Sequence, residues 1–346
     1  MLQRIRFFGL FLCTFICAFI LFSVSVLSAD RITVQEGKGK NVSGTILAVN
    51  SEKVTIDVRG ERQEIPANII ASTEYDNEPS GLKAVRTAFD GSRMSETLEA
   101  LAKVDAKTLT KPEMKQEFEY FTAAAKTKSV LAGSGDLADA EKSLLNFIKN
   151  NKNSYHYFEV CELYGDLMVQ AGKFDDAKKS YAALAKAPWS EYSLKATVSL
   201  GMAEITEKKI DSARKNFETV IKSEDNSEQA ERLKKIANIG QALCLTSEKK
   251  YDEAIKMFEE IAKNSGGEDS AFQSLVYNSL GLTYEQAGKP RDAILAYMHT
   301  DILFSSARNE HIKALQELSK LWKQVKRNER AEETDKRLKS IYNINK

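Results

Sequence analysis

The chain has 346 residues, of which 29% are charged and 42% hydrophobic, and it contains only five prolines. This composition is typical of folded helical proteins and excludes a largely disordered chain. The formal net charge of +1 gives no electrostatic reason to expect a nucleic-acid partner, because such a partner requires clustered cations that neutralise phosphates.

The N-terminus has the features of an export signal. Arg4 and Arg6 precede an uncharged run over residues 7–27, which is followed by Ser28-Ala29. A basic start, an apolar run and small residues at its end predict a secretory signal peptide over residues 1–29. As a helix, the 21 residues of the run would also reach roughly 30 Å, which is enough for an uncleaved single-pass membrane anchor. Both alternatives predict that the rest of the chain is exported to the periplasm or cell envelope, or is secreted.

Residues 30–75 alternate β-branched and polar side chains between short turns. Val54, Ile56 and Val58 share one face of the clearest segment, and glycine or asparagine marks the turns. This pattern predicts a small antiparallel β module, either an SH3-like barrel or a sheet that packs on the first helices. Residues 76–120 are expected to form a linker and a degenerate helical hairpin.

Six alanines stand at the same place in consecutive helical segments, just after a turn and 36 to 41 residues apart. A large side chain follows four residues after each of the first five, and a glycine stands twelve residues before three of them. This spacing predicts pairs of helices that pack too closely for larger side chains at these positions. The residues assigned to repeat packing are Ala140, Ala177, Ala213, Ala254, Ala293, Ala331, Gly165, Gly201 and Gly281.

The clearest unit runs from Phe158 to about Glu191 and combines Tyr164-Gly165, a turn at residues 172–176 and Tyr181. These residues and their spacing resemble the tetratricopeptide repeat family. The resemblance covers residues 121–346 and implies a mainly α fold, a tetratricopeptide-type α-solenoid of helical hairpins preceded by the small antiparallel β module. An export signal followed by repeats is similar to exported bacterial repeat-containing proteins. The six repeats are expected to start near residues 121, 158, 194, 235, 274 and 312.

In this family, positions 2, 5, 9 and 12 of each first helix line a concave groove. The resemblance therefore implies an apolar stripe in the middle repeats, exposed and suited to an amphipathic helix of a partner. A tightly coiled superhelix, the β module or a second copy of the chain in a homo-oligomer could cover the same stripe instead. The predicted partner groove consists of Val198, Met202, Ile205, Ile236, Ile239, Leu243, Asn278 and Leu282.

No pattern in the sequence predicts catalysis, a cofactor or a metal site. His156, His299 and His311 lack a His, Cys or carboxylate at metal-binding spacing, and each is expected to be a solvated or core histidine. We therefore predict a non-enzymatic scaffold that binds a protein or peptide partner in its groove, with no nucleic acid. The alternative is a membrane-anchored envelope or cell-wall assembly factor whose β module contacts the ligand.

Overall fold

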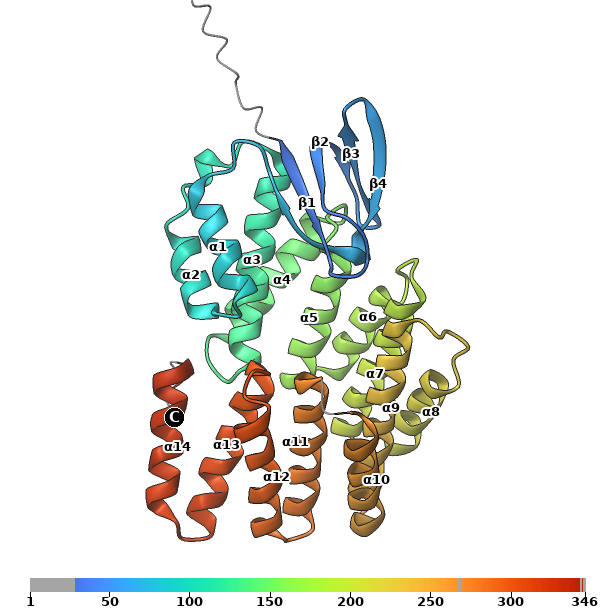
Figure 1. The fold of residues 1–346 in the computed structure, drawn as a ribbon, viewed down its shortest axis with the longest axis vertical. Helices are drawn as coiled ribbons and strands as arrows, with labels where there is room; N and C mark the ends of the chain where they lie inside the picture. Colours follow the sequence, from blue (N-terminus) through green and yellow to red (C-terminus); the bar gives the residue numbers. More distant parts are fainter. Residues whose placement is uncertain (1–28, 267–268, 343, 345–346) are drawn as a thin grey trace, which may run out of the picture.

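The computed structural model describes residues 29–266, 269–342 and 344. In these residues a five-stranded antiparallel sheet is followed by an array of helical hairpins (Figure 1). The predicted fold class is therefore confirmed. The predicted signal or anchor at residues 7–27 lies outside the described residues. Among the residues that are described, a helix with the length and hydrophobicity needed to span a bilayer is not found.

The N-terminal sheet has the strand order β4-β3-β2-β1-β5, and every neighbouring pair is antiparallel. Ile32, Val54 and Ile56 form its buried face, where alternate residues point to the same side of a strand. Tyr155 and Trp189 of the helical array complete this small core, so the sheet packs directly on the helices. The strands are β1 (Asp30–Val34), β2 (Val42–Val49), β3 (Lys53–Val58), β4 (Glu61–Pro66) and β5 (Ile70–Glu74), with a 3₁₀ turn, η1 (Ala67–Ile69), before β5.

The helices pair in chain order as antiparallel hairpins, beginning with α1 and α2 in the region predicted to hold a linker and a degenerate hairpin. The first helix of each later hairpin packs on the first helix of the next one. The helices are α1 (Ser80–Asp90), α2 (Met94–Ala102), α3 (Pro112–Leu131), α4 (Leu137–Asn150), α5 (Tyr157–Gln170), α6 (Phe174–Leu184), α7 (Ser190–Thr206), α8 (Ile210–Ile221), α9 (Glu228–Ser247), α10 (Tyr251–Asn264), α11 (Ser270–Gln286), α12 (Pro290–Leu303), α13 (Arg308–Gln324) and α14 (Asn328–Tyr342).

The turn inside a hairpin uses one residue in the left-handed region after the first helix. Gly172 and Gly288 occupy this position with φ of 71°, and Lys208 and Lys249 occupy it with φ of 63° and 64°. Glycine is the usual residue there because it has no Cβ to clash, and a lysine adopts the conformation at some cost. The same turn geometry recurs from repeat to repeat and therefore does not depend on a glycine in each one.

Where the two helices of a hairpin meet, an aromatic ring of the second helix packs against a glycine of the first. A Cβ added to Gly165 would lie 2.3 Å from the Tyr181 ring, and one added to Gly281 would lie 2.7 Å from the Tyr297 ring. Ala140, Ala177, Ala213, Ala254, Ala293 and Ala331 are all fully buried.

Phe217 of α8 extends this packing to two first helices at once. A Cβ on Gly201 of α7 would lie 2.7 Å from its ring, and a Cβ on Gly240 of α9 would lie 2.4 Å from it. The sequence pattern pointed to Gly201 but not to Gly240. One ring thus fixes how closely α7 and α9 approach α8.

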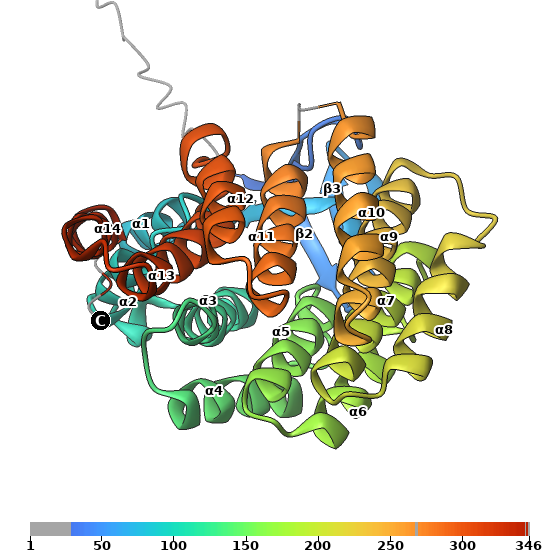
Figure 2. The same cartoon turned by 90° about the horizontal axis from the view of Figure 1, so that it is seen from below.

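The array curves so that its last hairpins return to its first ones. Figure 1 shows α13 below the end of α3, and in the view from below the strands of the sheet lie behind the helices (Figure 2). The side-chain amide of Gln316 in α13 donates to the carbonyl oxygen of Ala132 at the end of α3, at 3.4 Å. Figure 1 shows the sheet across the end of the array that the first hairpins form.

We predict that Gly240→Ala lowers the free energy of unfolding by about 1–3 kcal/mol, because the added methyl overpacks the Phe217 ring. Chemical denaturation of the wild type and the variant measures this difference. Phe217→Leu is the matched second change, since a smaller side chain makes room for the methyl. The cost of the double variant should therefore be less than the sum of the two single costs, and simple additivity would contradict the predicted contact.

Candidate functional site

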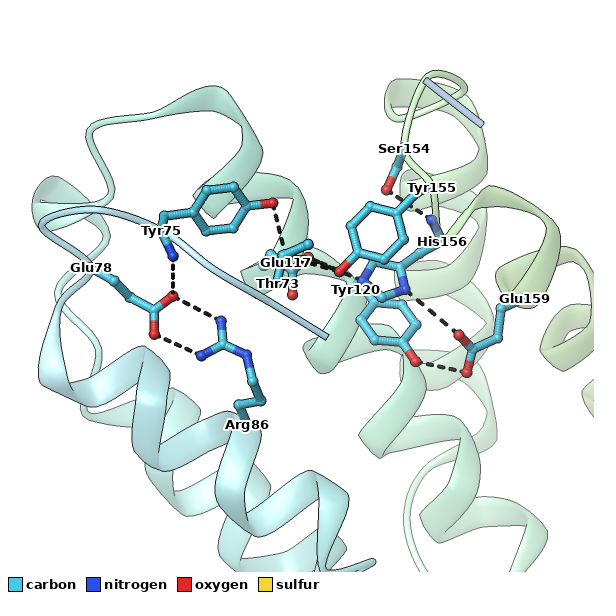
Figure 3. A network of polar contacts seen from close by, with 10 residues as sticks. All are labelled: Thr73, Tyr75, Glu78, Arg86, Glu117, Tyr120, Ser154, Tyr155, His156 and Glu159. Atoms are coloured by element: carbon cyan, nitrogen blue, oxygen red, sulfur yellow. Dashed lines mark hydrogen bonds and ion pairs between the residues drawn. The ribbon is translucent and has the colours of Figure 1, made fainter. Parts of the chain in front are cut away.

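Glu117 of α3 is a buried carboxylate at the junction of the sheet and the helical array (Figure 3). Its Oε1 accepts hydrogen bonds from the Tyr155 hydroxyl at 2.5 Å, from the Thr73 hydroxyl at 3.0 Å, and from His156 Nε2 at 3.2 Å. Burial alone would raise the pKa of Glu117, but the charge and hydrogen bond of His156 hold it below its ordinary value. The carboxylate therefore ties β5 of the sheet to α3 and to the loop before α5.

His156 lies between two carboxylates. Its Nε2 faces Glu117, and its Nδ1 lies 3.6 Å from a carboxylate oxygen of Glu159 on α5. The Tyr120 ring stacks on the imidazole with centroids 3.5 Å apart, and the Tyr120 hydroxyl donates to Glu159 at 2.7 Å. Burial opposes a charge on this ring, but the two carboxylates raise the pKa of His156 above its ordinary value. His156 is a core histidine held as an ion pair, a role that its sequence neighbours did not reveal.

Arg86 of α1 forms a second buried ion pair beside this cluster. Its Nη1 and Nη2 donate to the two carboxylate oxygens of Glu78 at 2.7 and 2.8 Å (Figure 3). The same Glu78 carboxylate accepts from the backbone N–H of Tyr75, which follows β5. This bidentate pair fixes the end of the sheet to α1.

Arg86, Glu117 and His156 help to line a cavity of about 420 Å³ between the sheet and the helices. Asn68, Ala71 and Ser72 line it from the sheet side. Helices α1, α3, α5 and α7 supply the other walls, and Glu162 of α5 pairs there with Lys195 of α7 at 2.6 Å. We call this space the junction cavity. Besides the three sheet residues, it is lined by Gln35, Ala67, Ile70, Arg86, Phe89, Asp90, Glu117, Tyr120, Phe121, Tyr155, His156, Glu159, Glu162, Tyr192 and Lys195.

A second cavity of about 390 Å³ lies where α13 returns to α3 and α5. Asp166 of α5 and Lys313 of α13 both line it. Burial and the neighbouring Glu162 raise the pKa of Asp166 to about 6, although the Tyr181 hydroxyl donates to it at 2.7 Å. The face of α5 that carries Glu159, Glu162 and Asp166 therefore runs from one cavity to the other.

The predicted apolar stripe is only partly accessible. The expected exposure is wrong for Val198, which packs against Phe217, and for Ile239, which packs against Phe258. It is also wrong for Asn278, whose side-chain amide donates to Glu310 across the α11–α13 contact. All three stand at position 5 of a first helix, where successive first helices pack on each other.

The remaining residues of the predicted groove keep some exposure. Met202, Ile205, Ile236 and Leu243 are half-buried, and Leu282 is 40% exposed. Met202, Leu243 and Leu282 at position 9 thus stay accessible, whereas Val198, Ile239 and Asn278 at position 5 do not. Glu159 and Glu162 stand at positions 2 and 5 of one first helix and Lys195 at position 2 of the next, and the structure brings these three to the junction cavity.

Among the described residues, no group of three or more His, Cys, Asp or Glu side chains is arranged to hold a metal ion. His299 is exposed and stacks on Tyr277, while His311 lies between Asp301 and Tyr342. Cys161 and Cys244 are buried free thiols. Burial raises the pKa of each thiol to about 11, so neither thiol is activated.

Residues 235–300, which span most of α9 to α12, match the tetratricopeptide repeat family. This segment of the chain has the tetratricopeptide repeat pattern. Such repeats are generally non-enzymatic binding domains that present extended concave surfaces. None of the curated proteins compared with the chain matches it.

Several solved structures are similar to this chain. A tetratricopeptide repeat protein from Parabacteroides merdae is 16% identical with a TM-score of 0.47, and the match covers 77% of this chain and 93% of that one. A Rap protein complexed with Competence and Sporulation Factor is 11% identical with a TM-score of 0.48, covering 75% and 73%. NprR in complex with its cognate peptide NprX is 15% identical with a TM-score of 0.44, covering 75% and 76%.

We predict that the stability advantage of the wild type over His156→Gln is largest between about pH 4.5 and 6.5. The raised pKa of His156 stabilises the fold below its ordinary value of 6.5, and this contribution is lost as the pH rises through the folded pKa. The lowered pKa of Glu117 contributes above its ordinary value of 4.5 and is lost as the pH falls.

Chemical denaturation of both proteins across a pH series measures this advantage. Inside the window, we expect it to be about 3 kcal/mol or more, because the variant leaves Glu117 buried without its nearest cation. A difference that does not change with pH would show that His156 is neutral in the folded protein.

Proposed function

We propose that the chain is a non-enzymatic scaffold that binds a segment of a protein partner along the inner face of its tetratricopeptide repeats. The junction cavity is the observation that supports this most directly. Glu159, Glu162 and Lys195 stand at groove positions 2 and 5 of consecutive first helices, and all three line one cavity together with residues of the sheet. The β module and the groove thus contribute to the same site.

This arrangement also explains why a small sheet precedes the repeats. Asn68 and Ser72 reach the junction cavity from the sheet side, so a ligand in the cavity would contact both parts of the chain. A partner segment that leaves the cavity would next meet position 9, where Met202, Leu243 and Leu282 remain accessible. The site therefore combines a polar end at the sheet with an apolar course along the middle repeats.

We predict that a photo-crosslinking amino acid at Leu282 captures the partner and that the same group at Leu145 does not. Leu145 lies on α4, a second helix, and its exposed fraction of 44% is close to the 40% of Leu282, so it is a matched control. The experiment uses the full-length chain expressed in its host, and mass spectrometry identifies the captured protein.

Met202→Asp and Leu243→Asp should then abolish the adduct at Leu282 without unfolding the chain. Both side chains are half-buried, so circular dichroism must show that the helices persist in the variants. Equal adducts from Leu282 and Leu145, or an unchanged Leu282 adduct in the folded variants, would contradict binding along the inner face.

We also propose that the scaffold works outside the cytoplasm, because Arg4, Arg6 and the apolar run at residues 7–27 have the pattern of an export signal. We expect mass analysis of the chain purified from its host to find an N-terminus at Asp30. Retention of the apolar run together with membrane association would favour the anchored envelope factor instead. A cytoplasmic chain with an intact N-terminus would contradict export.

A further inference from the structure

We propose that the junction cavity binds a peptide unit next to a cationic side chain, so that the partner segment is anchored there by a lysine or arginine. This inference deepens the proposed function and rests on it. It is carried by two unused hydrogen-bonding atoms and by the charges on the cavity wall.

The first unused atom is a donor. Arg86 is 5% exposed, and its Nη1 and Nη2 are both engaged by Glu78. Its Nε has no hydrogen-bond partner in the described part of the chain, although Arg86 lines the junction cavity. Buried donors are almost always hydrogen-bonded in folded proteins. We therefore infer that the Nε–H donates to an acceptor on a ligand that enters the cavity.

The second unused atom is an acceptor on the sheet side of the cavity. Asn68 Nδ2 donates to a carboxylate oxygen of Glu191 on α7 at 2.9 Å. Because a carboxylate only accepts, this bond fixes the orientation of the amide and leaves Oδ1 as the buried atom without a partner. One unused donor and one unused acceptor complement the C=O and N–H of a peptide unit.

The charges favour a cation beside that peptide unit. The Glu159 side chain is 40% exposed, and in the part of the chain that the structure describes its one ion-pair partner is His156, at 3.6 Å. Asp90 is exposed at the rim and has no ion-pair partner among the residues that the structure describes. Lys128 lies near both and offsets part of their charge. Counting the neighbours Glu78 and Lys128, the cations are Arg86, Lys128, His156 and Lys195, and the carboxylates are Glu78, Asp90, Glu117, Glu159 and Glu162, so the carboxylates exceed the cations by one.

Aromatic rings around these carboxylates suit the same ligand. Tyr192 lines the cavity from α7, Tyr120 lines it from α3 with one face stacked on His156, and Phe89 lines it from α1 with Lys128 Nζ already 4.3 Å from its ring centroid. Ring faces attract a cation, and the rings also pack on the methylene groups of a lysine or arginine. An anionic side chain would meet the excess of carboxylates. A simple ammonium ion has no acceptor, so it would leave the Arg86 Nε–H without a partner.

The test uses three small probes that differ only in the side chain: N-acetyl-lysine-methylamide, N-acetyl-norleucine-methylamide and N-acetyl-glutamate-methylamide. Each carries peptide units, and the norleucine probe keeps the aliphatic stem of lysine without its charge. The readout is the ¹⁵Nε–¹Hε signal of Arg86 in the full-length chain, followed by NMR as each probe is added. All binding probes should shift this signal, with the lysine probe roughly two- to fivefold tighter than the norleucine probe and the glutamate probe weakest.

Two variants separate the contributions. Glu159→Gln keeps the shape of the side chain and should remove the preference for lysine over norleucine. Asn68→Leu should weaken the lysine and norleucine probes by the same factor, roughly two- to tenfold, because it removes the acceptor for the peptide N–H. Glu191→Asp is the matched control for Asn68. It shortens the partner of Nδ2 but keeps a carboxylate that only accepts, so Oδ1 stays available and binding should persist.

A cavity filled only by water would give no probe-dependent shift of the Arg86 signal, and this result would overturn the inference. Equal affinity for the lysine and glutamate probes would overturn the assignment of a cationic ligand. Either failure is distinct from failure of the proposed function, because partner capture at Leu282 is measured independently. Capture that persists while the probes fail would leave the scaffold with an inner-face partner that does not use the junction cavity.

Discussion

The close approach of helices within and between hairpins is the constraint on which the structure depends. An aromatic ring of a second helix fills the space left by a missing side chain on a first helix, as Tyr297 does against Gly281. Phe217 touches two first helices in this way, through Gly201 and Gly240. Dense packing of this kind fixes the angle of each step, and repeated steps bring α13 back to α3. The curvature that places the sheet beside α3, α5 and α7 therefore begins with residues that lack side chains.

A buried carboxylate then joins the sheet to this array. Glu117 has no free access to water, so donors from the surrounding elements must compensate its charge. Thr73 supplies one donor from β5, and Tyr155 and His156 supply two from the loop before α5. Removing any of these donors leaves a poorly compensated buried charge. The hydrogen bonds therefore fix the relative position of the sheet and the helices more precisely than an apolar contact of the same size would. They also hold the walls of the cavity in place.

The sequence predicted the repeats well and the site poorly, for a physical reason. Helix pairing within a hairpin is local, so alanines at a fixed spacing and a glycine twelve residues earlier report it directly. The repeat spacing did not identify Gly240, because its packing partner Phe217 belongs to the preceding repeat. Position 5 was expected to be exposed, but the tight curvature buries Val198 and Ile239 between neighbouring hairpins. Arg86, Glu117 and His156 come from three separate segments, and no short-range pattern links them.

The core of the sheet limits where the chain can be cut into fragments that fold and which parts recombination can exchange. Tyr155 and Trp189 complete that core, although they lie more than eighty residues beyond the last strand. A fragment that ends before them would expose the apolar face of the sheet, and a fragment that begins after the sheet would leave these rings uncovered. The strands and the first repeats are therefore one folding unit. Recombination could add or remove hairpins near the C-terminus more easily than it could transfer the sheet to another protein.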